Sequence, residues 1–211
     1  MRTLVIDSAT EACSVALLDG GALLAGDCIR MGRGHAEALV PMIAALPDKG
    51  RADCIVVALG PGSFTGVRVG LAAGRALAFA WGAELRGYPT LALVAAMARQ
   101  QRGAVPVCTA MTGGHGEWFV AAFAADGTES RRLTSLPPQA AAAMPETLVA
   151  GSQAEALVAA RGHGEALAIW PDARCFALLD ASWISAQVHP LYGRAPDARL
   201  PGDVRLPEVS A

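Results

Sequence analysis

The chain has 211 residues, of which 53% are hydrophobic and 17% are charged, and its formal net charge is −2. This length accommodates one large domain or two small ones, and the hydrophobic fraction excludes a disordered chain. A protein that binds a phosphate backbone by itself usually carries a basic face. Here the arginines are scattered along the chain, so independent tight binding of RNA is not expected.

The cysteines and the apolar segments indicate a soluble, cytoplasmic protein without membrane association. The five cysteines are odd in number and form no C-x-x-C pair, which gives no metal or redox pattern. The opening MRTLVIDSAT is typical of a short strand and lacks the longer apolar region of a signal peptide. The most apolar stretch, 67–83, contains Arg68 and Arg75 and is too polar to span a membrane.

The first half of the chain predicts alternating strands and helices. Short apolar runs with β-branched residues predict strands, and apolar residues spaced three and four apart predict helices. The strands are expected at 2–7, 13–18, 22–29, 53–59 and near residue 85, and the helices at 34–46, from the loop after residue 60 to about 81, and at 90–100. The first three strands, with Asp19-Gly20-Gly21 as a turn, form an antiparallel meander.

The same order of elements restarts after residue 102. Strands are expected at 105–110, 117–124, 129–133, 147–150 and 166–170, and helices at 138–143, 153–161 and 174–188. This predicts two α/β lobes with mixed sheets, residues 1–102 and a smaller lobe at 103–211 that includes the tail. The tail at 190–207 is rich in proline and contains apolar residues, so it is expected to be ordered against the body.

The segment GPGSFTG at 60–66 connects a buried strand to a helix. Ser63 and Thr65 are good N-cap residues, and a helix N-terminus with free N–H groups can bind an anion. The spacing of Gly60, Gly62 and Gly66, with Pro61 between the first two, matches neither a Walker A loop nor a dinucleotide-binding loop. Two interpretations stay open, a weak anion or nucleotide contact and a tight structural turn. Asp7, at the end of the first strand, has the same two interpretations.

Gly66, Gly70 and Gly74 recur every four residues along the predicted helix. Each glycine inside a helix costs about 1 kcal/mol relative to alanine. Positions four apart share a face, so this face is nearly bare backbone and allows another element to approach closely. The element that approaches is either the sheet of the same lobe or another helix.

The ionisable residues form no recognisable catalytic set. The four histidines are scattered, and the position four residues after His35 is Leu39 rather than a second histidine, so no metal site is expected. Ser63 does not lie in a G-x-S-x-G sequence, which argues against a serine hydrolase. No catalytic residue and no cofactor are therefore predicted.

Several stretches together resemble the bacterial TsaB (YeaZ) family. The most specific is GPGSFTGVRVG after a DCIVVAL strand. The opening IDSATEACSVALL resembles the family's first strand-turn-strand, and 35–41 resembles its H-[SA]-E-x-L-x-P helix. The sequence at 88–91 resembles the G-[VI]-[ST]-[ST]-L entry to a helix, and 190–194 resembles P-x-Y-x-R.

The resemblance implies a two-lobed actin-like ATPase fold, shared with Hsp70 and the sugar kinases, with a reduced second lobe. It also implies a role in making N6-threonylcarbamoyladenosine at position 37 of tRNAs that read ANN codons. In that pathway TsaD transfers the threonylcarbamoyl group to tRNA, and the ATPase TsaE joins the complex. TsaB is the paralogue that pairs with TsaD, so the chain is expected to be a non-catalytic subunit that meets tRNA only through the complex. A homodimer is expected when the chain is alone.

Two departures from the family patterns limit what can be carried over. The histidine pair that binds metal in TsaD has only His35 as a counterpart, and the D-A-R-x-x-E-V pattern at the start of the second lobe is replaced by TAMTGGHGEWF at 109–119. An active ATPase or kinase that uses Asp7 and the loop at 60–66 is the main alternative function. A glycopeptidase is a further alternative, for which no metal or nucleophile is apparent.

The helices at 34–46 and 64–81 are predicted to form the partner surface in a four-helix contact with TsaD or with a second copy of the chain. The side chains expected to make this contact are Leu39, Met42, Ile43, Leu71 and Arg75.

Overall fold

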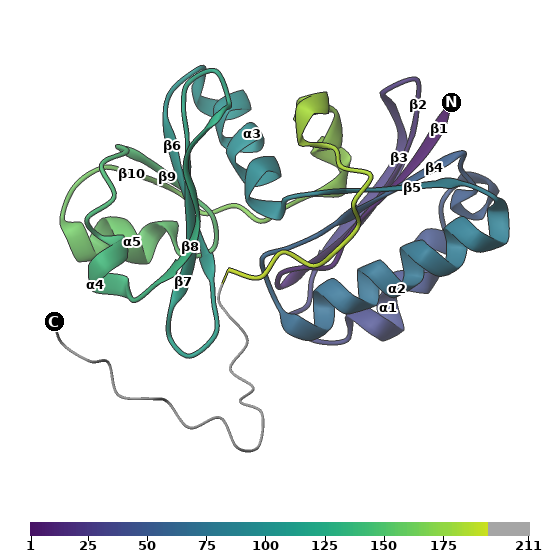
Figure 1. Ribbon diagram of the computed structural model, residues 1–211, viewed down its shortest axis with the longest axis horizontal. Helices are drawn as coiled ribbons and strands as arrows, with labels where there is room; N and C mark the ends of the chain where they lie inside the picture. Colours follow the sequence, from purple (N-terminus) through teal and green to yellow (C-terminus); the bar gives the residue numbers. More distant parts are fainter. Residues whose placement is uncertain (194–211) are drawn as a thin grey trace, which may run out of the picture.

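The computed structural model describes residues 1–193, which form two α/β lobes side by side (Figure 1). Most of the predicted tail, from residue 194 onward, lies outside the described residues. Each lobe is built on one five-stranded sheet. No helix among residues 1–193 combines the length and the apolar character needed to cross a bilayer.

The first sheet has the order β3-β2-β1-β4-β5. Its strands are β1 Arg2–Asp7, β2 Ala12–Asp19, β3 Ala22–Arg30, β4 Cys54–Ala58 and β5 Glu84–Tyr88. The first three are antiparallel, as the meander pattern predicts, and β1, β4 and β5 are parallel. All five residues of β4 are buried, because helices and turns cover both faces of the sheet at this strand.

Helices α1 (His35–Ala44) and α2 (Phe64–Trp81) lie next to each other on one face of the first sheet (Figure 1). The turn η1 (Pro47–Gly50) leads from α1 into β4. Helix α3 (Thr90–Arg102) follows β5 and carries the chain into the second lobe. Eight residues of α3 are buried, because this helix lies between the lobes and contacts β6, β7 and β9 of the second sheet.

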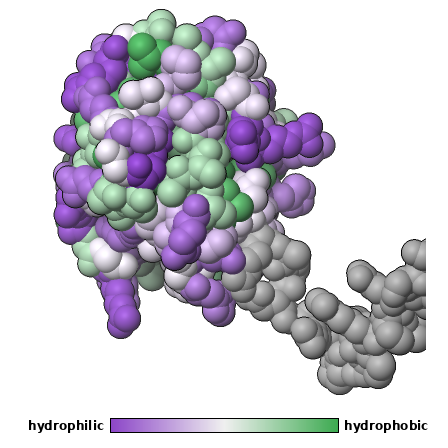
Figure 2. All heavy atoms as spheres, turned by 90° about the vertical axis from the view of Figure 1, so that its left-hand side faces the viewer, coloured by the Kyte–Doolittle hydropathy of each residue, from purple (hydrophilic) through white to green (hydrophobic). Residues whose placement is uncertain are grey.

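The second sheet has the order β10-β9-β6-β7-β8, which repeats the pairing of the first sheet. Its strands are β6 Val107–Thr112, β7 Trp118–Phe123, β8 Glu129–Leu136, β9 Leu148–Ala150 and β10 Glu165–Leu167, and its outer helices are α4 Pro138–Ala141 and α5 Ala154–Arg161. The lobe is smaller because β9 and β10 have only three residues each. Its outer side carries small apolar patches separated by hydrophilic residues (Figure 2).

The prediction of a helix at 174–188 is wrong. The chain instead forms two 3-10 turns, η2 (Ala173–Leu178) and η3 (Ala181–Trp183). Asp172 and Asp180 accept hydrogen bonds from the backbone N–H two residues later and begin a new turn each time. Such local capping by Asp competes with a continuous helix.

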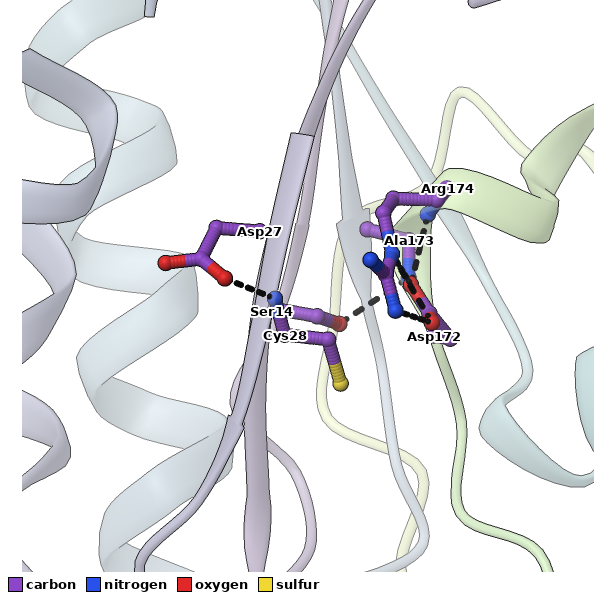
Figure 3. A network of polar contacts seen from close by, with 6 residues as sticks. All are labelled: Ser14, Asp27, Cys28, Asp172, Ala173 and Arg174. Carbon is purple, nitrogen blue, oxygen red and sulfur yellow. Dashed lines mark hydrogen bonds and ion pairs between the residues drawn. The ribbon is translucent and has the colours of Figure 1, made fainter. Parts of the chain in front are cut away.

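The segment that begins at Asp172 returns to the first sheet, although the sequence assigns it to the second lobe. The amide of Ala173 donates to Ser14 Oγ on β2 at 2.9 Å, and Arg174 forms an ion pair with Asp172 (Figure 3). A side chain at Gly26 on β3 would lie 2.6 Å from Arg174 Cγ. The glycine therefore allows this segment to pack closely over β2 and β3.

The glycine face of α2 packs against its own sheet. Gly66, Gly70 and Gly74 are all buried. A Cβ at Gly70 would lie 2.6 Å from Ser8 Oγ, and a Cβ at Gly74 would lie 2.5 Å from Val57 Cγ1. The dispersion energy of this close contact offsets the low helix propensity of glycine, and it identifies the approaching element as the sheet of the same lobe.

We expect Gly70→Leu to destabilise the protein by about 2–3 kcal/mol, because the added side chain overlaps Ser8. Helix propensity alone predicts the opposite sign, by about 1 kcal/mol. Ala72→Leu places the same side chain on the exposed side of α2 and is expected to change stability by less than about 0.5 kcal/mol. Urea unfolding of both variants measures the difference, and equal stabilities would contradict the close-packing account.

Candidate functional site

The carboxyl ends of the parallel strands β1, β4 and β5 meet at one edge of the first sheet. Asp7 ends β1, Leu59 follows β4, and Tyr88 ends β5. In open α/β sheets this edge is the usual place for a ligand. It is therefore the candidate site of the chain.

Asp7 is fully buried at this edge, and both of its carboxylate oxygens are engaged by the chain itself. Oδ1 accepts a hydrogen bond from the amide of Ala9 at 3.0 Å, and Oδ2 accepts one from the Tyr88 hydroxyl at 2.8 Å. Burial raises the pKa of Asp7 to about 6, although both hydrogen bonds lower it. The same burial, together with the charge of Asp7, holds the pKa of Tyr88 well above its usual value. This carboxylate therefore has an internal partner on each oxygen.

The backbone groups near Asp7 are also hydrogen-bonded within the chain. The amide of Leu59 donates to the Tyr88 carbonyl at 2.8 Å, and the amide of Thr90 donates to the Gly60 carbonyl at 2.8 Å. The amide of Leu191 donates to the Leu59 carbonyl at 2.7 Å. Three separate parts of the chain thus satisfy these backbone groups at the strand ends.

The loop at 60–66 holds the start of α2 against the turn that follows β1. Ser63 caps the helix by accepting from the amide of Gly66 at 3.3 Å, and its own amide donates to the Ala9 carbonyl at 2.7 Å. Ser8 Oγ donates to the Gly66 carbonyl at 2.9 Å. Pro61 is buried within the loop, and Thr65 is exposed on the first turn of the helix.

The charges around this loop favour the tight-turn interpretation. A Cβ at Gly62 would overlap the Ala9 carbonyl oxygen, and a Cβ at Gly66 would overlap the Ser8 carbonyl oxygen. Carbonyl oxygens carry partial negative charge, so their position next to the helix start opposes an anion there. The glycines at 62 and 66 serve this backbone contact.

Four of the five predicted partner residues are not presented to a partner. Leu39, Met42, Ile43 and Leu71 are buried in the core of the first lobe. This part of the prediction is corrected, because the apolar stripe of each helix faces its own sheet. Arg75 is exposed, and its guanidinium donates to the Val188 carbonyl at 2.7 Å.

The opposite sides of α1 and α2 expose other large apolar side chains, which we call the two-helix surface. Phe79 is 92% exposed, Phe64 is 69% exposed and Val40 is 62% exposed. Sequence reasoning missed these residues because it assigned the partner contact to the main apolar stripe. The sequence pattern that could have indicated them is a large apolar residue that lies outside the apolar stripe of its helix.

The histidines form no metal site in the structure. His35 is buried, with Nε2 2.8 Å from the Thr10 carbonyl oxygen, which ties α1 to the turn after β1. No group of His, Cys, Asp and Glu residues that could hold a metal ion occurs within residues 1–193. In the stretch at 109–119, Glu117 accepts a hydrogen bond from Ser135 Oγ at 2.7 Å. Its carboxylate therefore links the turn between β6 and β7 to β8.

Comparison with known families identifies the relatives of the chain. Residues 30–165, more than half of the chain, match the family model of TsaD, the tRNA N6-adenosine threonylcarbamoyltransferase. The chain belongs to this family, and the relatives and solved structures that it resembles carry the names TsaB and YeaZ. The two α/β lobes with mixed sheets expected from the sequence are confirmed.

Two curated relatives bear the name tRNA threonylcarbamoyladenosine biosynthesis protein TsaB. The protein from Escherichia coli is 40% identical over 133 residues, 60% of this chain, and the one from Haemophilus influenzae is 42% identical over 100 residues, 45% of this chain. The matched regions span 56% and 41% of these two relatives.

Solved structures extend the likeness to most of the chain. YeaZ from Pseudomonas aeruginosa matches with a TM-score of 0.76 and 28% identity, over 90% of this chain and 99% of that one. A second structure, described as similar to the peptidase YeaZ from the same organism, matches with a TM-score of 0.75 and 29% identity, over 92% and 99%. The likeness therefore covers both lobes.

We expect the buried Asp7 to make stability depend on pH. Its pKa is raised from 3.8 to about 6, so the folded state binds more protons than the unfolded state between these values. Stability therefore falls as pH rises from about 4 to about 6, by roughly 3 kcal/mol for a shift of about two pH units. In Asp7→Asn this contribution is absent, so the stability of the variant relative to wild type should rise over the same range.

Denaturant unfolding of wild type and Asp7→Asn at several pH values measures this difference. Tyr88→Phe provides a second check, because loss of its hydrogen bond to the carboxylate should move the wild-type transition to higher pH. A difference between wild type and Asp7→Asn that stays constant with pH would contradict the assignment.

Proposed function

We propose that the chain acts in the formation of N6-threonylcarbamoyladenosine in tRNA as a non-catalytic partner of a TsaD subunit. The observation that carries the proposal is the two-helix surface, on which Val40, Phe64 and Phe79 are exposed. The family relation supports the pathway, because relatives of the chain are named for threonylcarbamoyladenosine biosynthesis. We place this function in the cytoplasm, without membrane association.

The closed edge of the first sheet supports the non-catalytic role. The carboxylate of Asp7 accepts from Ala9 and Tyr88, and the turn after β1 packs against the loop at 60–66. An ATPase or kinase that used Asp7 would need it free to meet a metal–phosphate pair. This arrangement disfavours the alternative ATPase function.

The two-helix surface has the chemistry of a helix-packing interface. Large apolar side chains exposed on two adjacent helices support a contact with another protein when they gather on one face. The same two helices also expose several alanines, namely Ala36, Ala44, Ala45, Ala72, Ala76 and Ala80. Small residues let the backbones of partner helices come close.

A paralogue with the same fold carries two helices at the corresponding place. Two such surfaces related by an approximate two-fold axis form a four-helix contact. This explains why the same surface serves a TsaD subunit and, in its absence, a second copy of the chain. TsaE is proposed to join the pair as a third subunit, with tRNA bound only through the complex.

We expect Phe79→Glu to weaken binding of the TsaD subunit from the same organism by about 30-fold or more, the loss typical of an interface hot spot. Phe79 is 92% exposed, so the variant should stay folded with nearly unchanged stability. Leu24→Glu, on β3 outside the two-helix surface, introduces the same charge at another exposed apolar residue and should bind as wild type does. Calorimetric titration measures both, and wild-type affinity for Phe79→Glu together with Val40→Glu would exclude this surface.

We also expect the purified chain to hydrolyse no ATP and to hold no stoichiometric metal, because Asp7 is engaged within the sheet edge. Phosphate release and metal analysis of the isolated chain test this. ATP turnover that disappears in Asp7→Ala, or about one zinc or iron per chain, would support the alternative catalytic function.

A further inference from the structure

The last described segment, residues 185–193, crosses from the edge of the first sheet to the second lobe (Figure 1). We call it the strap. Ser185 exchanges two backbone hydrogen bonds of 2.9 Å with Gly87 on β5. The Val188 carbonyl accepts from Arg75 on α2, and the Leu191 amide donates to the carbonyl of Leu59 after β4. The strap thus contacts three elements of the first lobe.

The end of the strap reaches the second lobe. A Cβ at Gly193 would overlap the ring of Phe119 on β7 and would lie 3.5 Å from Leu133 Cδ1 on β8. The absence of a side chain at Gly193 therefore lets the strap pass close to the second sheet. One short segment joins both lobes across the closed edge.

Arg68 connects the strap to the two-helix surface. Its NH2 group donates to the Tyr192 hydroxyl at 2.8 Å, and its NH1 group donates to the Phe64 carbonyl at 3.0 Å. The guanidinium also stacks on the Phe64 ring, 3.2 Å from its centroid. Arg68 thus contacts both Tyr192 of the strap and Phe64, which belongs to the proposed partner surface.

The strap is attached mainly by polar contacts rather than by burial. Tyr192 is 56% exposed and Leu191 is 37% exposed, and only Val188 is buried. A segment with few buried apolar contacts opens at a low free energy compared with the rest of the fold. An opened strap would lose the hydrogen bond between Tyr192 and Arg68.

We propose that the strap is a latch that controls the two-helix surface. Closed, it holds Arg68 and Phe64 in the arrangement that the partner subunit meets. Open, it leaves the first turns of α2 without this support and weakens partner binding. Linkage makes the effect reciprocal, so a bound partner favours the closed strap. The inference rests on the proposed function and adds a regulatory element to the same surface.

The latch itself is tested by amide hydrogen exchange of the full chain. Exchange at Leu191 reports opening, because this amide donates to Leu59 in the closed strap. Tyr192→Phe keeps the ring and removes only the hydroxyl, and it should speed exchange at Leu191 at least about threefold. Arg68→Gln should do the same. Arg102→Gln, which breaks the ion pair with Glu165 on the second lobe, is the matched control and should leave Leu191 unchanged.

The coupling to the partner is tested by binding of the TsaD subunit to wild type and to a double variant, Leu191→Pro with Tyr192→Ala, that removes the hydrogen bonds of the strap's end to Leu59 and Arg68. Both bonds are removed together, because a latch that stays mostly closed hides a modest weakening. The double variant should bind at least about tenfold more weakly, and partner addition should slow Leu191 exchange in wild type.

The outcomes separate the latch from the proposed function. Wild type that binds the TsaD subunit, with a double variant of equal affinity, overturns the coupling and leaves the proposed function standing. Wild type that does not bind overturns both. Unchanged Leu191 exchange in Tyr192→Phe and Arg68→Gln overturns the connection through Arg68.

Discussion

The contact between the start of α2 and the turn after β1 determines most of the first lobe. Gly62 and Gly66 meet the carbonyl oxygens of Ala9 and Ser8 with no side chain between them. Only glycine allows backbones to approach this closely. The contact sets where α2 begins and turns its glycine face to the sheet. As a result, the other face of α2, with Phe64 at its start, is turned outward.

The same contact lies beside the sheet edge at which Asp7 is buried. Asp7 stands at the sheet edge where open α/β sheets usually bind ligands, and it is buried with the Tyr88 hydroxyl bonded to its carboxylate. Burial of a carboxylate is unfavourable, as its raised pKa shows. Two hydrogen bonds reduce this penalty and leave the group engaged.

The second sheet repeats the strand order of the first on a smaller scale. The lobes are not formed by two separate parts of the sequence, because the chain passes between them more than once. After β10 the chain returns to the first lobe through Asp172 and Ala173, and the strap then reaches back to Phe119. Two crossings of this kind tie the lobes together. They also place the end of the described chain beside α2, where the proposed partner would bind.

The order of strands and helices could be predicted from the sequence because hydrophobic periodicity and turn residues are local. β4 is apolar throughout and is buried on both faces, and the doubled order of elements predicts the two lobes. The helix predicted at 174–188 failed because the capping of turns by Asp172 and Asp180 outweighs an apolar spacing that is only weakly helical. Whether such a segment forms one helix or two capped turns depends on what the segment packs against in the folded protein.

The glycine row and the partner residues divide in the same way. The spacing of Gly66, Gly70 and Gly74 determined that something approaches one face of α2, whereas only the tertiary structure showed that it is the sheet of the same lobe. An apolar stripe reads the same whether it faces a core or a partner, so the sequence alone placed Leu39 and its neighbours on the surface. Folding used that stripe for the core, because burial against the adjacent sheet is available within the same chain. The side chains left for a partner are those that the sheet does not cover.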